Sequence, residues 1–227
     1  RRLERTVIPR AADVVVFNMS GAERLGALSP RVRFSPNWFD PAEFFPAEVE
    51  APIKSRILWP ARIEPQKNPE LAVEVMSVLP RHYTLTVAGS GSLESAMRRA
   101  ALDSPAADRI CFVGAVPKSE MGVLMRRHDL LLMTSLFEGY PYAVVEGLAS
   151  GLPVVTTPGG EPNGLVVSGV NGARVECDRA ELFTAAMEIA AGIPAEAARE
   201  SVSRLSAVTV VPDVLTMPGA AGSTERE

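Results

Sequence analysis

The sequence has few cysteines, and it lacks the long apolar run that a membrane-spanning helix requires. Its two cysteines, Cys111 and Cys177, are far apart and show no CxxC or Cys/His spacing, which argues against a disulfide framework and a structural zinc site. No apolar run approaches the ~20 residues of a membrane span, and no basic and apolar leader opens the chain. We therefore expect free thiols in a reducing compartment and a soluble, cytoplasmic protein.

Excess positive charge is also absent. The 227 residues include 23 basic and 27 acidic side chains, a net charge of −4, so the sequence does not indicate a general nucleic-acid-binding surface. Any phosphate is expected to bind at a local site. With 47% hydrophobic residues the chain can form one large domain or two small ones. It begins inside a helix-like stretch, so we expect further sequence upstream.

Apolar, strand-like runs alternate with helix-length amphipathic segments over most of the chain. This pattern predicts an α/β fold with a Rossmann-like parallel sheet and flanking helices. The expected strands are 12–17, 56–60, 83–89, 109–114, 129–135 and 152–157, and the expected helices are 69–79, 92–102, 119–128, 141–150, 181–192 and 194–205.

Local signals predict where helices and domains begin. Asn68 and Ser119 occupy expected N-cap positions, and Pro69 and Pro141 are expected first helical residues. The proline-rich and acidic stretch 29–52 predicts a strand end followed by a linker, with a domain boundary near residue 47. After residue 206 the chain is expected to form a flexible tail.

Ligands of an open parallel sheet bind where the strands end, so the loops that follow the strands are the most informative. After the strand at 56–60, Arg62 and Lys67 precede a helix N-terminus and could clamp a diphosphate. Common surface-loop cations are the alternative. After the next strand, Gly89 and Gly91 allow close approach of a ligand or positive φ. The full G-x-G-x-x-G spacing fails because Glu94 occupies the third glycine position, and an ordinary turn remains an alternative.

The stretch EGYPYAVVE places Glu138 in a loop and Glu146 inside an apolar helix. Burying a carboxylate costs on the order of several kcal/mol unless hydrogen-bond donors reach it. Sugar hydroxyls are such donors, whereas a salt bridge or an outward-pointing side chain are alternatives. Gly159 and Gly160 offer either an anion contact or a plain turn. His82 and His128 show no metal-ligand or catalytic spacing and are interpreted as structural.

These segments together resemble the C-terminal half of family 4 glycosyltransferases, which have the GT-B architecture. The matching segments are ARIEPQK, GSG, ICFVG, EGYPYAVVEGLASGLPVV and PGG, within a similarity from about residue 10 to 205. ADVVVFNMS resembles the last strand of the family's N-terminal domain, and SPNWFDPAEFFP resembles the crossing segment. The resemblance therefore implies a remnant of the N-terminal acceptor domain and a linker at 1–46, a nucleotide-sugar-binding domain at 47–206 and a tail at 207–227.

The resemblance also implies a function and site residues. It implies retaining transfer of a hexose from a UDP- or GDP-sugar to an unknown acceptor, without a cofactor or obligatory metal. Arg62 and Lys67 match the diphosphate pair, Glu138 matches the sugar-binding glutamate near the reacting carbon, and Glu146 matches the ribose-binding glutamate. The donor site would also include Gly89, Gly91, Gly139, Tyr140, Pro141 and Tyr142; Pro141 has no N–H to donate.

Departures from the family pattern leave the donor open. Ala61, Asn68 and Gly147 replace usual small residues, and Asn163 stands where an acidic residue is common. The missing N-terminal domain would supply the acceptor site and a histidine that neither histidine here matches, and it could also bring peripheral membrane association. Alternative functions are a noncatalytic nucleotide-sugar-binding module or truncated paralogue, a nucleotide-sugar epimerase or phosphorylase, and an interaction domain.

Overall fold

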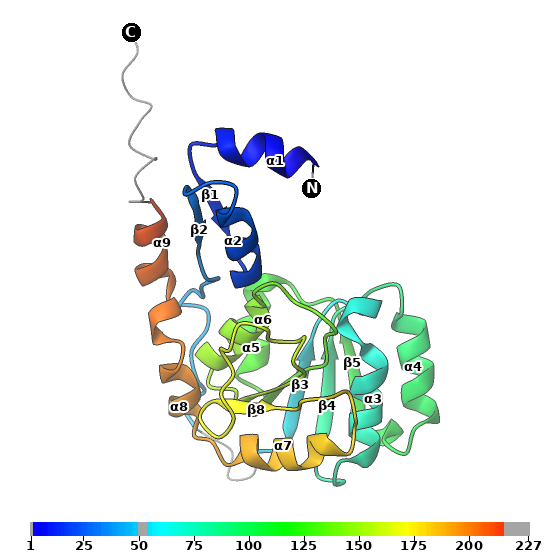
Figure 1. Ribbon diagram of the computed structural model, residues 1–227. Helices are drawn as coiled ribbons and strands as arrows, with labels where there is room; N and C mark the ends of the chain where they lie inside the picture. The colour runs from blue at the N-terminus through cyan, green and yellow to red at the C-terminus, as the bar shows by residue number, and fades with distance from the viewer. Residues whose placement is uncertain (1, 50–53, 216–227) are drawn as a thin grey trace.

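The computed structural model describes residues 2–49 and 54–215, which form a small N-terminal unit and a larger three-layer unit (Figure 1). In the small unit, strands β1 and β2 pair in parallel, with Val14 opposite Val32. The half-buried valines of β1 leave this two-stranded sheet without a large core. Its elements are α1 (Arg2–Val7), η1 (Ile8–Arg10), β1 (Val14–Val16), α2 (Met19–Gly26) and β2 (Val32–Phe34).

The larger unit is built on a six-stranded parallel sheet in the order β5-β4-β3-β6-β7-β8. From β3 the chain adds β4 and then β5 on one side of that strand. It then crosses to the other side of β3, where it adds β6, β7 and β8 in turn. The predicted α/β class and the Rossmann-like parallel sheet are therefore confirmed. The strands are β3 (Arg56–Pro60), β4 (Thr84–Ala88), β5 (Ile110–Gly114), β6 (Leu130–Met133), β7 (Val154–Thr156) and β8 (Gly172–Arg174).

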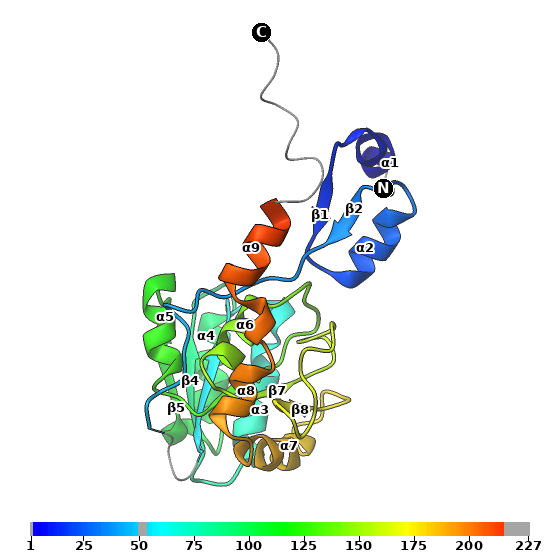
Figure 2. The same ribbon diagram turned by 90° about the vertical axis from the view of Figure 1, so that its left-hand side faces the viewer.

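Helices cover both faces of this sheet (Figures 1 and 2). Side chains alternate along each strand, so Ile57 and Trp59 join the core under α3, α4 and α7, whereas Leu58 joins the core under α5, α6 and α8. No helix among the described residues is both long and apolar enough to cross a bilayer. The helices are α3 (Pro69–Val78), α4 (Glu94–Asp103), α5 (Lys118–Met125), α6 (Tyr142–Ala149), α7 (Leu182–Ala191) and α8 (Ala195–Glu200), with short 3-10 turns η2 (Pro65–Lys67), η3 (Ala107–Arg109) and η4 (Ser203–Leu205).

The two ends of the larger unit meet beside α6 and α8. Phe39 and Phe44, from the predicted linker, are buried in the second core. Phe39 forms a bridge with Ser206 and accepts a hydrogen bond from the N–H of Ala207. The expectation of a flexible tail from residue 207 is wrong at its start, because α9 (Ala207–Leu215) continues as a helix. Residues 216–227 and the linker end at 50–52 lie outside the described residues.

Two helix starts differ from the sequence expectation. Pro141 occupies the N-cap of α6 instead of its first turn, and Pro117 caps α5, so Ser119 lies inside that helix. Both prolines are extended, with ψ of 115° and 147°, which places the helix start after them. Asn68 precedes α3 as predicted, but at φ 48° its side chain forms no cap hydrogen bond. Strand β8 and helix α2 were not expected from the sequence.

The loops after β3 and β4 lie against each other, and this contact requires glycine. Ala61 N–H donates to Ala88 O at 3.1 Å. A Cβ at Gly89 would lie 1.9 Å from the carbonyl oxygen of Ala61, and a Cβ at Gly91 would lie 2.4 Å from that of Ile63. Neither glycine has a positive φ. The glycines are thus explained by backbone contact between the two loops.

We predict that Gly89→Ala lowers the free energy of unfolding by about 3 kcal/mol, at the upper end of the usual cost of overpacking. The reason is that the new methyl group meets backbone, which cannot rotate away as a side chain can. Urea unfolding monitored by circular dichroism measures the change. Gly139→Ala is the matched control, because its Cβ would meet nothing within 4 Å. Equal stability of the two variants would contradict the steric explanation.

Candidate functional site

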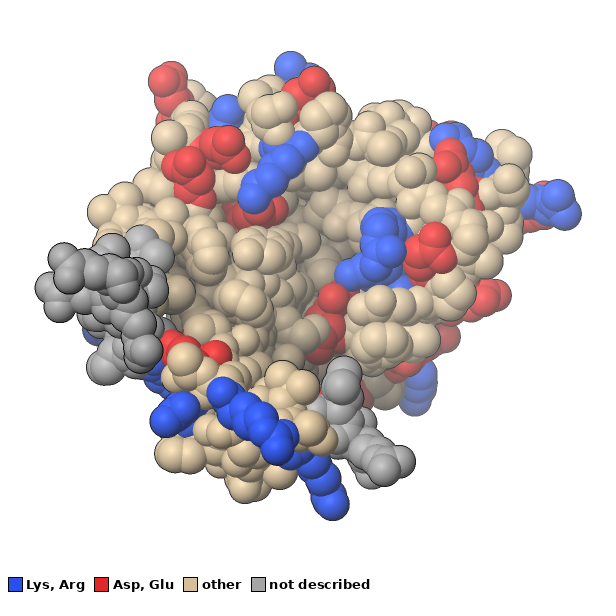
Figure 3. Space-filling view, turned by 90° about the horizontal axis from the view of Figure 1, so that it is seen from above, with Lys and Arg blue, Asp and Glu red and all other residues tan. Residues whose placement is uncertain are grey.

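The predicted charged loop residues, Arg62, Lys67 and Glu138, follow β3 and β6, the adjacent strands between which the strand order reverses. The predicted Gly89 and Gly91 follow β4, and Glu146 lies within helix α6. Ligands of open α/β sheets bind at this reversal, beyond the carboxyl ends of the strands. These ends lie on the side of the sheet that carries the β1–β2 unit (Figures 1 and 2). Viewed from that side, the surface is hollowed near its middle, and basic and acidic side chains lie beside the hollow (Figure 3).

Hydrogen bonds hold the two loops together. The buried indole of Trp59 donates to Thr134 Oγ1 at 2.9 Å, and that hydroxyl donates to the Lys67 carbonyl at 2.8 Å. Leu136 N–H donates to the Gln66 carbonyl at 2.8 Å. Because backbone groups of both loops take part, the side chains they carry have fixed relative positions.

Lys67 and Glu138 form an ion pair across these loops. Ser135 Oγ also donates to Glu138 Oε1, at 2.7 Å. The side chains of Lys67 and Glu138 are 16% and 9% exposed, so water screens the pair only in part. An ammonium group has three N–H donors, and Glu138 is its one acceptor among the described residues. Lys67 can therefore bind an anion while it remains paired.

Arg62 lies in the same loop as Lys67 but is exposed and forms no ion pair within the described part of the chain. Hydrogen bonds from Ser92 hold the pKa of Glu64 below its ordinary value, and the Arg62 charge acts in the same direction. Arg62 is thus available to an anion from solvent. The structure does not show it in contact with Lys67.

Glu146 is buried in α6, with 8% of the residue exposed. Burial raises its pKa to about 7; Lys118 opposes this change and Glu43 adds to it. Among residues 2–49 and 54–215 no hydrogen bond or ion pair to its carboxylate is found. Glu146 therefore does not form the salt bridge that was the alternative interpretation. Its neighbouring charges are Lys118 and Glu43. No contact joins it to Arg62 or Lys67.

The loop between the two glutamates is held by side-chain amides. Asn163 Nδ2 donates to the Gly139 carbonyl at 2.7 Å, and Asn37 Nδ2 donates to the Tyr140 carbonyl at 2.5 Å. Burial, with a contribution from Glu161, raises the pKa of Tyr140 to about 12, so its hydroxyl stays protonated at neutral pH.

The two residues that follow this tyrosine begin helix α6. Pro141 is its buried N-cap, and Tyr142, its first residue, is exposed. The Tyr142 ring centroid lies 5.6 Å from Lys118 Nζ. Lys118 is thus close to both Tyr142 and the charge of Glu146, although the sequence pattern gave no reason to single it out.

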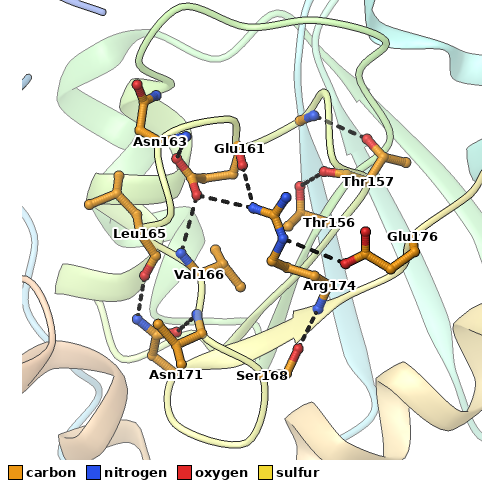
Figure 4. A network of polar contacts seen from close by, with 12 residues as sticks. Thr156, Thr157, Glu161, Asn163, Leu165, Val166, Ser168, Asn171, Arg174 and Glu176 are labelled. Carbon is orange, nitrogen blue, oxygen red and sulfur yellow. Dashed lines mark hydrogen bonds and ion pairs between the residues drawn. The ribbon is translucent and has the colours of Figure 1, made fainter. Parts of the chain in front are cut away.

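The sequence also did not reveal the polar network around Glu161, which is completely buried (Figure 4). Glu161 Oε1 accepts from Asn163 N–H at 2.8 Å, and Oε2 accepts from Val166 N–H at 3.3 Å. Arg174 NH1 donates to the Glu161 carbonyl at 2.7 Å and lies 3.7 Å from Oε2. The sequence did contain a signal for this network. An acidic residue directly follows Gly159-Gly160, and an arginine lies in the next strand.

The histidines take part in local packing. Both ring nitrogens of His128 are hydrogen-bonded, to Leu124 O and Thr86 Oγ1 at 2.8 Å each, and burial lowers its pKa. The His82 ring packs against Tyr83 in a tilted arrangement, with 4.3 Å between the ring centroids. Within the described part, no group of three or more His, Cys, Asp or Glu residues could hold a metal ion.

Comparison with solved structures identifies the fold. The chain superposes on Anabaena HepE in complex with UDP and glucose with a TM-score of 0.77 at 17% identity, covering 94% of this chain and 65% of HepE. Sucrose-phosphate synthase from Thermosynechococcus elongatus gives a TM-score of 0.77 at 19% identity, covering 94% and 59%. The larger unit has the architecture of GT-B glycosyltransferase C-terminal domains.

Comparison with curated sequences agrees with this fold assignment. The 2-deoxystreptamine glucosyltransferase of Streptomyces kanamyceticus is 30% identical over 216 residues, covering 87% of this chain and 52% of the relative. The D-inositol 3-phosphate glycosyltransferase of Pseudarthrobacter chlorophenolicus is 26% identical over 204 residues, covering 82% and 49%. The chain thus spans about half the length of these relatives. Residues 42–199 match the family model described as glycosyl transferases group 1, and the chain belongs to that family.

Proposed function

We propose that the chain is the donor-binding part of a retaining glycosyltransferase of the family 4 type, which transfers a hexose from a UDP- or GDP-sugar to an acceptor of unknown class. The observation that carries the proposal is the pairing of Lys67 with Glu138 at the strand-order reversal, next to a helix that buries the unpaired Glu146. The similarity to HepE, which binds UDP and glucose, supports the choice of donor.

Each charged residue has a role in this proposal. Arg62 and Lys67 bind the diphosphate, and the N-terminus of α6 adds its partial positive charge. As the bond between the sugar C1 and the diphosphate oxygen breaks, negative charge grows on the departing nucleoside diphosphate, and these cations stabilise it. Glu138 binds hydroxyls of the transferred sugar, and Glu146 accepts hydrogen bonds from ribose hydroxyls. Side-chain cations neutralise the diphosphate, so we propose that no metal is obligatory.

The proposal places the acceptor site in an additional N-terminal domain, because the chain spans about half of its relatives. The sugar anomeric carbon would then lie between that domain and the β6–α6 loop. Peripheral membrane association through such a domain is part of the same proposal.

A noncatalytic nucleotide-sugar-binding module is the second candidate. The observation that favours it is that Glu138 Oε1 accepts from both Lys67 and Ser135, which leaves Oε2 as the oxygen available to a sugar hydroxyl. Such a module would bind nucleotide sugar without transfer or donor hydrolysis when the acceptor domain is present. Release of UDP from UDP-glucose distinguishes the two candidates.

We predict that UDP or GDP stabilises the protein by about 2.7 kcal/mol at about a hundred times the dissociation constant. Lys67→Ala and Glu146→Ala should abolish the shift in thermal unfolding temperature, because they remove a phosphate and a ribose contact. The shift should persist in EDTA. Arg81→Ala is the control, since Arg81 pairs with Asp108 on an exposed surface and should not affect binding. If the wild-type protein shows no shift with either nucleotide, the proposal is wrong.

The raised pKa of Glu146 predicts how stability depends on pH. The folded state binds this proton more tightly than the unfolded chain, since the pKa rises from 4.5 to about 7 on folding. Stability should therefore decrease as pH rises from about 4.5 to about 7, by about 3 kcal/mol from this group. Glu146→Gln should remove this loss, which urea unfolding at pH 5 and pH 8 measures. An unchanged pH dependence in the variant would show that Glu146 is not buried as described.

The same protonation should control donor binding. Ribose hydroxyls donate best to the ionised carboxylate, so binding of UDP-glucose should strengthen about tenfold between pH 6 and pH 8 for a group whose pKa is near 7. UDP-glucose is the suitable probe because its esterified diphosphate does not titrate in this range. Isothermal titration calorimetry measures the change, and Glu146→Gln should bind with no such pH dependence. Equal pH dependence in both proteins would place the titrating group elsewhere.

A further inference from the structure

The short loop Gly139–Pro141, between the two glutamates, is held from two directions. Asn163, from the segment after β7, donates to the Gly139 carbonyl at 2.7 Å. Asn37, from the segment after β2, donates to the Tyr140 carbonyl at 2.5 Å and is 5% exposed. Two successive carbonyl groups are therefore fixed by side chains that are distant in sequence, 24 residues away in one case and 103 in the other.

Fixing a carbonyl also fixes the N–H of the same peptide. The described chain has no cis peptide bonds, and in a trans peptide the C=O and N–H groups point in opposite directions. The N–H of Tyr140 therefore points away from Asn163. In the described residues this N–H has no hydrogen-bond acceptor. The next residue, Pro141, has no N–H to donate.

Asn163 is itself held in place. Its N–H donates to Glu161 Oε1 at 2.8 Å, and Arg174 anchors the buried Glu161 (Figure 4). A carboxylate side chain at position 163 could not donate to the Gly139 carbonyl and would place its negative charge beside an acceptor. The amide at this position is what makes the contact possible.

We infer that Asn163 is a positioning residue that fixes the Gly139–Tyr140 peptide so that the Tyr140 N–H faces the donor. Asn37 supports it by fixing the following Tyr140–Pro141 peptide. The inference rests on the proposed function, because it requires a diphosphate or sugar oxygen as the acceptor of that N–H. It gives a bound-state partner to the Tyr140 N–H, which has no acceptor among the described residues. It also gives the buried Glu161–Arg174 pair an effect on the site through Asn163.

Tyrosine labelling provides a direct test, because the chain contains three tyrosines. Protein labelled with ¹⁵N-tyrosine gives backbone amide signals from Tyr83, Tyr140 and Tyr142 in a two-dimensional NMR spectrum. UDP-glucose is the probe. In the wild-type protein the Tyr140 signal should move on titration, whereas Tyr83, whose N–H is bonded to Pro80 O at 3.1 Å, should not.

The variants are Asn163→Ala and Asn163→Asp, with Ser168→Ala as the matched control. Ser168 accepts from Arg174 N–H at 3.0 Å in the same segment but does not contact Gly139. Either change at Asn163 should move the Tyr140 signal in the ligand-free protein and weaken UDP-glucose binding roughly 3- to 10-fold, as expected for one hydrogen bond. Ser168→Ala should leave both readouts unchanged. Asn37→Ala should move the Tyr140 signal less than Asn163→Ala, because Asn37 holds the Tyr140–Pro141 peptide and not the peptide that carries the Tyr140 N–H.

The outcomes separate the inference from the proposed function. If wild-type protein binds UDP-glucose and the Asn163 variants bind it equally with an unmoved Tyr140 signal, the inference is wrong and the proposed function stands. If Ser168→Ala weakens binding as much as Asn163→Ala, general loosening of the segment replaces specific positioning. If wild-type protein binds neither UDP-glucose nor GDP-glucose, both the proposed function and the inference are wrong.

Discussion

The hydrogen bonds between the β3–α3 and β6–α6 loops are the constraint on which the site depends. They lie at the reversal of strand order, where two adjacent parallel strands send their chains to opposite faces of the sheet. Thr134 links the buried Trp59 to the backbone of Lys67. Without this link the Lys67–Glu138 pair would join two independent surface loops, and its geometry would be lost to side-chain entropy. The sheet core therefore determines the position of the charged groups.

Much of this arrangement could be predicted from sequence because its signals are local. Apolar runs of strand length gave all the central strands, including β3 and β6, and position after a strand indicated Lys67 and Glu138. The apolar surroundings of Glu146 predicted burial, which the structure confirms. Local signals fail where two patterns compete. Pro141 could occupy either the N-cap or the first turn, since its fixed φ suits both positions, and the fold places it at the N-cap.

Contacts between distant segments could not be predicted, because nothing in a single sequence marks the partner. Asn37 lies in what the composition describes as a linker, yet it bonds to Tyr140 across 103 positions. Asn163 drew notice only as a departure from a family pattern, and the bond to Gly139 explains what the amide does. Gly89 is the opposite case, in which the local signal was visible but its structural cause was not. Its signal was correctly recognised, but the structure explains it by contact with Ala61, and a ligand contact remains a prediction.

The two glutamates of the β6–α6 segment differ in their electrostatic environment, although only a short loop and half of α6 lie between them. Within the described residues, one is ion-paired and the other is not. Glu138 pairs with Lys67 and accepts a hydrogen bond from Ser135, so the protein itself fixes the direction of its carboxylate. Glu146 has no such partner, and its pKa of about 7 means that burial opposes its charge. An apolar side chain at that position would stabilise the unliganded fold. Under the proposed function, hydroxyl donors of the ligand would replace the water that this carboxylate has lost, and the charge at Glu146 would then become favourable.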